Sequence, residues 1–289
     1  MQKNEKSYIK LPCLYNTMDL SKPILFVDGS YYVFYRYYAT MMWWSKQDDN
    51  KNKEKGSAMS DASFVEKYEK MFYSTLSNLM KVYGVPSDNV FIAKDCSRCE
   101  IWRHDLYSFY KATRDTKLES FDSTVFTKTY SSILPNKNIR VIEIANLEAD
   151  DVIALMVKNV FKQNPKADVT IITNDNDYIQ LLQYYEDLLI INLQGKQIKK
   201  RIHTDVDHYL LTKIIMGDKS DNIPAIMKGC GPKTAEKLAK SPEDLAKVLN
   251  KDPMIKQQFE LNEKLISFEK IPCVYAREAE VLFAKLLKI

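Results

Sequence analysis

Three acidic side chains crowd into four residues of the stretch ANLEADDVIALMVK, residues 145–158: Glu148, Asp150 and Asp151. Helix capping is one interpretation, because an acidic side chain in a first helical turn accepts hydrogen bonds from free N–H groups and complements the helix dipole. Capping needs only one acid, however, and three neighbouring carboxylates repel one another beside the apolar run that follows. A bound cation would remove that repulsion, so this stretch alone leaves capping and metal binding both open.

The elements that must position these acids are short apolar runs alternating with helical patterns. Five runs rich in β-branched and aromatic residues are typical of buried strands, at residues 24–27, 90–93, 140–144, 169–172 and 188–192. Helical patterns lie between them, notably at 61–83, 150–163 and 177–185, and from about residue 205 the pattern is helical with short turns. This alternation predicts an α/β fold with a mostly parallel central sheet flanked by helices on both faces.

Two segments interrupt this pattern. Residues 45–60 are polar, and residues 115–138 are weakly patterned, so both are predicted to be loops or weak helices.

Carboxylates follow four of the predicted strands at their carboxyl ends. Asp28 follows the first strand, Asp95 the second, the 148–151 group the third, and Asp175 with Asp177 the fourth. In an open α/β sheet the functional site lies beyond the carboxyl ends of the strands, so these acids should converge. Oxygen ligands without paired His or Cys favour Mg²⁺ or Mn²⁺ over zinc, and the sequence therefore predicts a divalent-metal site with room for two ions.

A further acidic element lies in the helical part, in IIMGDKSDNIPAIMKGCGPKTAEKLAK, residues 214–240. Asp218 and Asp221 end one predicted helix, and the turn from Gly229 to Pro232 opens the next. One interpretation is a plain helix hairpin with solvated acids. The other is a phosphate site, in which Gly231 permits a close approach and the helix N-terminus presents N–H groups. Lysines surround this turn: Lys228, Lys233, Lys237 and Lys240.

The overall composition is that of an ordinary globular protein. The chain has 289 residues, of which 45% are hydrophobic and 28% charged, and no apolar run approaches the 18 residues of a membrane-spanning helix. No secretion signal is evident, and five scattered cysteines suit free thiols in a reducing compartment. Cys96 and Cys99 have the spacing of half a zinc site, but no second close pair accompanies them.

The ordered motifs resemble those of the flap endonuclease and 5′→3′ exonuclease family, which includes stand-alone phage enzymes and the N-terminal nuclease domain of bacterial DNA polymerase I. ILFVDGSYYVFYR and IAKDCSRCEIWRHDLYSFYKATR resemble its first two acidic motifs, and LEADD, TNDND and MGDKSDN resemble the others. KGCGPKTAEKLA resembles its DNA-binding helix hairpin. The likeness spans roughly residues 22–242.

This resemblance implies a role for individual residues. The nine acids named above would be metal ligands, and four basic residues would serve catalysis: Arg36, Arg103, Lys111 and Arg114. The hairpin would contact duplex DNA through Lys228, Gly229, Gly231, Lys233, Thr234 and Lys237. Some relatives bind K⁺ at this hairpin, and the irregular PAIMK segment leaves that ion open here.

The resemblance also implies a domain organisation. Residues 1–204 would form the nuclease core and residues 205–289 a helical region with the hairpin at 210–240. Residues 115–138 would form a helical arch that admits a single-stranded 5′ end, with Lys117, Phe121, Phe126 and Lys128 as contacts.

The implied activity is structure-specific hydrolysis of DNA with a 5′ flap or 5′ end, in replication or repair, by a two-metal mechanism. We expect an intracellular monomer, cytoplasmic or nuclear, and a virus- or phage-encoded enzyme is compatible with this size. Charge agrees: setting aside the nine proposed ligands leaves 29 acidic against 42 basic residues, a balance of +13 that favours a polyanion. A metal-dependent ribonuclease of the related PIN class and a non-catalytic DNA-binding protein remain alternatives.

The run MMWW, residues 41–44, is the other unusual feature. Such residues are most often core, but in the family this region packs against the end of a duplex, where exposed Met or Trp could stack. Both interpretations are kept.

Overall fold

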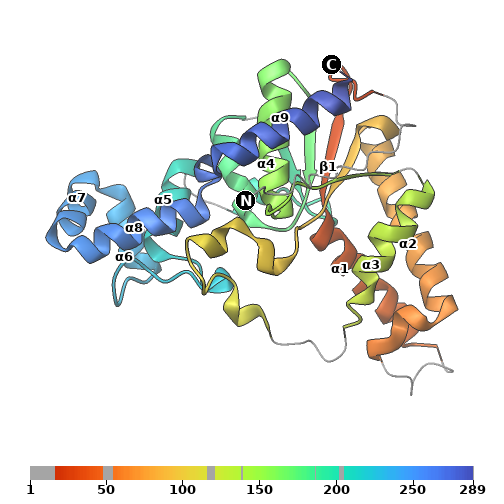
Figure 1. Ribbon diagram of the computed structural model, residues 1–289, viewed down its shortest axis with the longest axis horizontal. Helices are drawn as coiled ribbons and strands as arrows, with labels where there is room; N and C mark the ends of the chain where they lie inside the picture. The colour runs from red at the N-terminus through yellow and green to blue at the C-terminus, as the bar shows by residue number, and fades with distance from the viewer. Residues whose placement is uncertain are drawn as a thin grey trace, which may run out of the picture.

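A parallel β-sheet forms the centre of the chain. The computed structural model describes residues 17–47, 55–115, 121–137, 139–185, 187–201 and 205–288. The sheet has five strands in the order β3-β2-β1-β4-β5, and every neighbouring pair is parallel. The strands are β1 (Ile24–Asp28), β2 (Val90–Ala93), β3 (Arg140–Ile142), β4 (Val169–Ile172) and β5 (Leu189–Ile191). The predicted parallel sheet is confirmed, with strand bounds within two residues of those expected (Figure 1).

Helices cover both faces of the sheet, as the alternating pattern predicted. The α-helices of the described chain are α1 (Gly29–Trp44), α2 (Ala62–Val82), α3 (Thr124–Lys128), α4 (Ala149–Gln163), α5 (Val206–Met216), α6 (Pro232–Lys240), α7 (Pro242–Lys251), α8 (Pro253–Ile266) and α9 (Cys273–Leu287). The segment predicted as a helix at 177–185 is a 3₁₀-helix at Asn176–Gln183.

Two apolar clusters separate the helices into layers. Alternate strand residues face opposite sides of the sheet, so Phe26 contributes to the cluster under α4 and α9, whereas Leu25 and Val27 contribute to the cluster under α1, α2 and α3. In Figure 1 the two groups of helices lie on opposite sides of β1. The core is therefore a three-layer arrangement that holds the strand ends in fixed positions.

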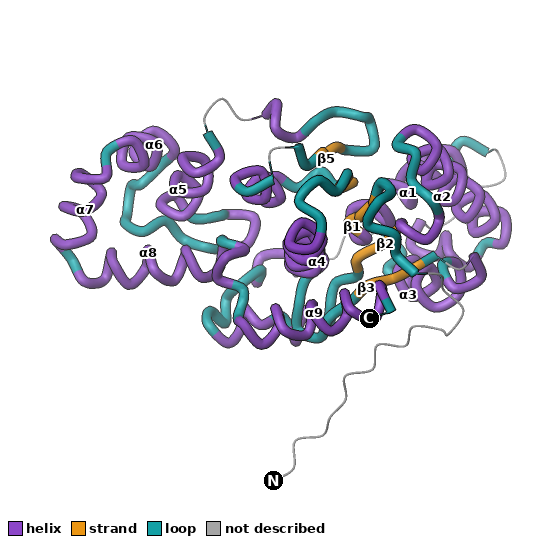
Figure 2. Tube along the Cα trace, turned by 90° about the horizontal axis from the view of Figure 1, so that it is seen from above, coloured by secondary structure: helices purple, strands orange, loops and turns teal. Residues whose placement is uncertain are grey.

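The helices α5 to α8 gather at one end of the molecule, beside the carboxyl edge of the sheet (Figures 1 and 2). Their own apolar cluster includes Ile215, Ile226 and Leu238. The last helix, α9, then returns to the sheet, where Leu282 and Leu286 join the cluster under α4. The division into domains at residue 204 stays a prediction.

The segments with weak patterning are partly helical. In the first, residues 55–60 form a 3₁₀-helix, and residues 48–54 lie outside the described chain. In the second, α3 is followed by a π-helical turn at Thr129–Ile133. Phe121 and Phe126 pack against Phe34 of α1, with ring centroids 4.7 and 5.0 Å away. These two predicted DNA contacts are therefore held against α1, and Lys117 lies outside the described residues.

The MMWW run belongs largely to the core. Met41 and Trp44, in the last turns of α1, are buried. The ammonium of Lys67 lies over the ring of Trp43, 4.8 Å from the ring centroid. Met42, at 65% exposure, is the member of the run that faces solvent.

No helix within the described ranges is long and apolar enough to span a membrane.

Strand order reverses at β1, because β2 and β3 lie on one side of it and β4 and β5 on the other. Such a switch point leaves a crevice beyond the carboxyl ends of the strands. Asp28 ends β1 at this place, so the fold itself directs attention to the crevice beside it.

Candidate functional site

A cleft of about 1560 Å³ lies beyond the carboxyl ends of the strands and extends to the turn before α6. Seven of the nine acids predicted as metal ligands line it: Asp28, Asp95, Glu148, Asp150, Asp175, Asp177 and Asp218. They come from the ends of β1, β2 and β4, from the start of α4 and from the loop after α5. The convergence predicted from the strand ends is therefore present in the structure.

Asp28 lies at the centre of this edge. One carboxylate oxygen accepts a hydrogen bond from the Tyr31 N–H at 3.1 Å, which caps α1, and the other accepts from the Thr173 hydroxyl at 3.0 Å. Burial, together with the nearby charges of Asp95 and Asp175, raises the pKa of Asp28 to about 7. The side chain is thus in a place where its negative charge lacks compensation.

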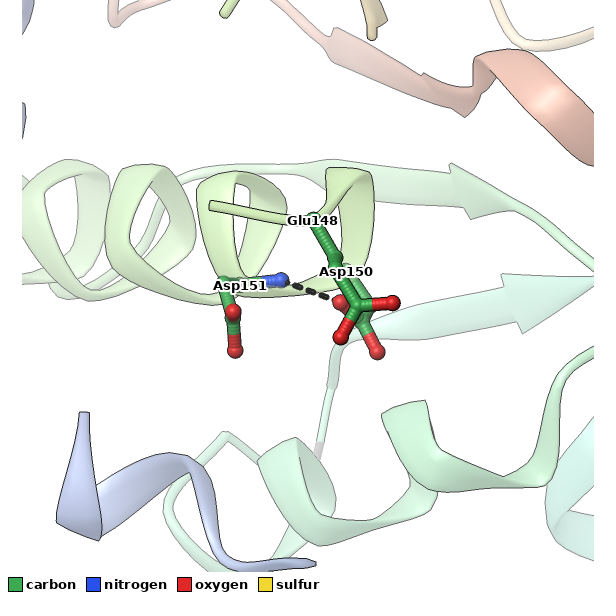
Figure 3. Close-up of side chains that lie close together, drawn as sticks. All are labelled: Glu148, Asp150 and Asp151. Carbon is green, nitrogen blue, oxygen red and sulfur yellow. Dashed lines mark hydrogen bonds between the residues drawn. The ribbon is translucent and has the colours of Figure 1, made fainter. Parts of the chain in front are cut away.

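Helix capping accounts for only part of the acidic start of α4. Glu148 occupies the N-cap position but makes no capping hydrogen bond with its side chain. The Ala149 N–H donates instead to Asp95 at 2.8 Å, and the Asp151 N–H donates to Asp150 at 2.7 Å (Figure 3). Capping therefore accounts for Asp95 and one oxygen of Asp150, and it leaves Glu148 and Asp151 unexplained.

Glu148, Asp150 and Asp151 form the α4 cluster, in which each offers a carboxylate oxygen within 4.8 Å of the others. Burial and the charges of Asp151 and Glu148 raise the pKa of Asp150 well above its usual value. In Figure 3 the carboxylates of Glu148 and Asp150 lie together, and that of Asp151 lies apart from them on the same side of the helix. The two acids that lie together also line the cleft.

Arg103 holds the carboxylate of Asp151 in place. Its guanidinium donates to both oxygens of Asp151, at 2.7 and 2.8 Å, and to Glu148 at 3.1 Å. It also donates to the Leu265 carbonyl at 2.8 Å, and Trp102 adds a bond to Asp151 at 2.9 Å. Arg103 is only 2% exposed. Arg103 is thus a buried cation that orients the carboxylates of Asp151 and Glu148, and its catalytic role stays a prediction.

Lys111 of the second motif lines the cleft, as does Arg98 of the same motif. Its ammonium pairs with Glu148 and lies 3.8 Å from Asp221. The neighbouring Tyr110 hydroxyl donates to Glu148 at 2.9 Å and to Asp221 at 3.1 Å. Burial opposes ionisation of Glu148, but Lys111 and Arg103 outweigh that effect, and the pKa of Glu148 is lowered.

The loop cluster is the second group of acids: Asp177, Asp218 and Asp221 offer oxygens within 4.8 Å of one another. Lys213 of α5 pairs with Asp177 and, at 2.8 Å, with Asp218. Burial opposes ionisation of Asp218, but Lys213 and the hydrogen bonds from Ser220 lower its pKa to about 2. Sequence reasoning missed Lys213, although a lysine inside the apolar run LLTKIIM was a usable signal.

The turn before α6 forms the far wall of the cleft, through Lys228, Gly229 and Gly231. Gly229 has φ +78°, a conformation that favours glycine. Gly231 has φ −89° and open space around its α-carbon, so the predicted backbone constraint belongs to Gly229 rather than Gly231. On α6, Pro232 takes the first position, and Lys233, Thr234 and Lys237 lie on its first two turns.

Two predicted catalytic arginines remain. Arg36 donates to the Thr75 hydroxyl of α2 at 2.7 Å and stacks on Tyr35, and it is absent from the described lining of the cleft. In this structure Arg36 therefore joins α1 to α2, and its catalytic role stays a prediction. The side chain of Arg114 lies outside the described residues.

Both clusters have the chemistry of a divalent-cation site. Their donors are carboxylates alone, the ligands that Mg²⁺ and Mn²⁺ prefer, and the raised pKa values of Asp28 and Asp150 mark negative charge that a cation would stabilise. Within the described residues, neither donor group that could share an ion includes Cys96 or Cys99, so the zinc interpretation gains no support.

Comparison with known proteins places this site in a family. Residues 23–209 match the family of the 5′-3′ exonuclease, N-terminal resolvase-like domain. A 5′-3′ exonuclease of Buchnera aphidicola subsp. Baizongia pistaciae is 26% identical over 272 residues, which cover 91% of this chain and 75% of that protein. DNA polymerase I of Lactococcus lactis is 29% identical over 234 residues, 76% of this chain but only 24% of the polymerase.

A solved structure shares the fold. It is a bacteriophage T5 flap endonuclease in a pseudo-enzyme-product complex with DNA and metal ions, with a TM-score of 0.62, 19% identity, and coverage of 92% of this chain and 97% of the phage protein. The family match spans all five strands of the sheet and reaches α5, so it includes every strand that carries an acid to the cleft. The chain therefore belongs to the 5′-3′ exonuclease family.

Proposed function

We propose that this protein is a metal-dependent 5′ nuclease that hydrolyses phosphodiester bonds in DNA, acting as a flap endonuclease and 5′→3′ exonuclease in replication or repair. The observation that carries the proposal is the convergence of seven carboxylates on one cleft, next to the ammonium of Lys111. Family membership supports the reaction type, and the cleft supports its place.

Two groups of residues suit two Mg²⁺ or Mn²⁺ ions. Asp28, Asp95, Glu148 and Asp150, which line the cleft, would hold one ion, and Asp151, paired with Arg103, would support them. Asp175, Asp177, Asp218 and Asp221 would hold the other, and the last three offer oxygens within 4.8 Å of one another. When bound, such ions supply Lewis acidity that activates water and stabilises the departing 3′ oxygen.

Lys111 is the residue that we assign to the scissile phosphate. It carries a positive charge at the wall of a cleft otherwise dominated by carboxylates, where a preorganised cation stabilises charge that develops on phosphate oxygens. Its pairing with Glu148 keeps it in place before substrate arrives. Arg114 keeps its predicted role beside Lys111.

We propose that the helical lobe, formed by the helices that follow residue 204, binds duplex DNA. The turn before α6 supports this, because Lys228 and Gly229 line the cleft and Lys233 and Lys237 are exposed beside it. Lysines and helix N-terminal N–H groups bind phosphates without reading sequence. We propose that this lobe comprises residues 205–289 and that Thr234 also contacts DNA. We also propose that the turn before α6 can bind K⁺.

We further propose that the protein acts as a monomer in the cytoplasm or nucleus. Its substrate would be a duplex with a 5′ single-stranded arm or a free 5′ end, and the segment 115–138 would contact that arm. The phage relative solved with DNA and metal ions supports a DNA substrate for this fold.

One assay separates this function from its alternatives. Flap DNA labelled at its 5′ end, the matching RNA and blunt duplex are each incubated with Mg²⁺ or with EDTA. We expect Mg²⁺-dependent cleavage of the flap DNA. Cleavage of RNA alone would indicate a PIN-class ribonuclease, and binding without cleavage a non-catalytic protein.

A matched pair of variants links the activity to the cleft. Asp175 and Asp168 flank opposite ends of β4, so Asp175→Asn alters the carboxyl edge and Asp168→Asn alters the amino edge. Asp168 is exposed and is not among the described cleft residues. We expect Asp175→Asn to lose activity and Asp168→Asn to keep it; equal activity in both would remove the cleft from the mechanism.

A further inference from the structure

Lys111 has an unusual backbone for a residue with a side chain. Its φ is +56°, in the left-handed region that is unfavourable for a non-glycine residue. Such a conformation persists only where the surrounding structure enforces it. The contacts around residues 109–111 should therefore reveal what keeps the Lys111 ammonium in the cleft.

The enforcing element is the loop of residues 218–223. Asp218 and Ile223 close it through two backbone hydrogen bonds of 2.9 and 2.8 Å. Inside it, Asp218 accepts from the Ser220 N–H at 2.8 Å and from its hydroxyl at 2.6 Å. Asn222 ends the loop with φ +60° and ψ 29°, another left-handed residue, of the type that tolerates this region best. The loop is thus a compact, internally bonded unit.

Two hydrogen bonds join this loop to the segment that contains Lys111. The Lys111 N–H donates to the Asp221 carbonyl at 2.8 Å. Two residues earlier in the chain, the Phe109 carbonyl accepts from the Asn222 side-chain amide at 2.8 Å. These two bonds hold the peptide units on either side of Tyr110. The Phe109 carbonyl also accepts from the Ala112 N–H at 3.1 Å, which closes the turn of residues 109–112 that contains the left-handed Lys111. The Asn222 bond to this same carbonyl is made by a side chain that can be altered without touching Lys111 or an acid.

We propose that Asn222 is a positioning residue, which fixes the left-handed turn at Lys111 and thereby directs its ammonium into the acidic cleft. This inference rests on the proposed function for its effect on catalysis, but the geometry of the turn does not depend on it. Without the Asn222 bond, Lys111 would gain access to ordinary backbone conformations in which its side chain leaves the cleft for part of the time.

The test uses Asn222→Gly, because glycine keeps the left-handed conformation while removing the amide donor. The control is Asn164→Gly. The Asn164 amide also joins distant segments by donating to the Leu20 carbonyl at 2.8 Å, and Asn164 caps the end of α4 opposite to the cleft. Asn222→Asp, which keeps the shape and the left-handed preference but lacks the donor, replaces the glycine variant if circular dichroism shows the latter unfolded.

The first readout is a double-mutant cycle under single turnover at saturating flap DNA and Mg²⁺. We expect Asn222→Gly to lower the rate about tenfold, since a small misplacement of a catalytic group has effects of this order or larger. Affinity for DNA in Ca²⁺ should stay within about twofold. In the Lys111→Ala background Asn222→Gly should cause no further loss, because both changes remove the same contribution. An equal loss in both backgrounds would overturn the proposal.

The second readout is hydrogen exchange of the Lys111 amide, followed by NMR without DNA. We expect Asn222→Gly to speed this exchange at least about tenfold while amides of β1 are unchanged, and Asn164→Gly to leave it as in the wild type. Unchanged exchange at Lys111 overturns the positioning role. A wild-type protein without nuclease activity would instead overturn the proposed function and leave this readout intact.

Discussion

The α4 cluster and the loop cluster hold similar numbers of carboxylates but balance their charge differently. In the loop cluster Lys213 pairs with Asp177 and Asp218, and the pKa of Asp218 falls to about 2. On the α4 side, Arg103 and Lys111 serve Glu148 and Asp151, while the pKa of Asp150 is raised and that of Asp28 reaches about 7. Lys213 therefore compensates two of the three acids of the loop cluster, whereas Arg103 and Lys111 leave Asp28 and Asp150 on the α4 side poorly compensated. Beside the loop cluster, burial and the charge of Asp177 also raise the pKa of Asp175.

This difference indicates which half of the cleft gains most from a cation. A divalent ion near Asp28 and Asp150 would replace repulsion by attraction, whereas one near Asp218 must compete with an ammonium already in place. We therefore expect the α4 side to bind its ion more tightly and the loop cluster to bind more weakly.

The largest effect is expected for Asp150→Asn. Activity should fall by at least about 10³-fold, because the neutral amide is a poor ligand. In EDTA at pH 8 the thermal midpoint should rise or stay unchanged, since a repelling carboxylate is removed. Cleavage assays and thermal unfolding measure both. Lower stability with full Mg²⁺-dependent cleavage would restore capping as the role of Asp150.

Lys111→Ala tests the cation shared by the two clusters. The single-turnover rate should fall roughly 10²–10³-fold, about 3–4 kcal/mol, as for the loss of one preorganised donor. DNA affinity in Ca²⁺ should change far less, since one phosphate contact among many is lost. Lys111→Arg should rescue only partly, because a planar guanidinium does not replace a compact ammonium. A rate within about threefold of wild type would remove Lys111 from catalysis.

Lys213→Ala sharpens the comparison between clusters. In EDTA it should destabilise the fold by about 3 kcal/mol, because a buried ion pair loses one partner and leaves carboxylates unpaired. Mg²⁺ should recover part of that loss, and the rate should fall only about tenfold. The control is Lys247→Ala, whose exposed pair with Asp244 spans 3.3 Å and should contribute little to stability. Urea unfolding with and without Mg²⁺ distinguishes them, and equal effects would contradict the assigned counterion.

The smallest effect concerns the turn before α6. Gly229→Ala forces a side chain into φ +78°, while Gly231→Ala meets open space at φ −89°. We expect Gly229→Ala to weaken duplex binding severalfold and Gly231→Ala to leave it nearly unchanged, with Lys233→Ala flattening the salt dependence. Fluorescence anisotropy across a salt titration measures all three. The reverse order for the glycines would mean that DNA itself approaches Gly231.

The positions of the acids were predictable because strand ends can be read from apolar runs, and parallel strands bring their carboxyl ends to one edge. The contacts that each charged side chain makes could not be predicted in this way. Arg103 and Asp151 are 48 residues apart and pair only because the 3₁₀ turn at Trp102–Asp105 faces α4. Lys213 was hidden in an apolar run, and the glycine constraint fell at Gly229 because the turn conformation, which no residue type specifies, places φ > 0 there.

The central claim is that poorly compensated carboxylates on the α4 side bind a divalent cation. Because the folded-state pKa of Asp28, about 7, lies above its ordinary value of 3.8, the folded protein keeps a proton that the unfolded chain releases. Metal-free stability should therefore fall as pH rises from about 4 to about 7, by the contribution of this group.

Thermal unfolding at pH 5 and pH 8, with Mg²⁺ and with EDTA, tests this claim most directly, since titration elsewhere cancels in the difference. We predict that the rise in thermal midpoint caused by Mg²⁺ is larger at pH 8 than at pH 5, shrinks in Asp150→Asn and is unchanged in Asp168→Asn. A rise that is the same at both pH values, and the same in all three proteins, would contradict the account.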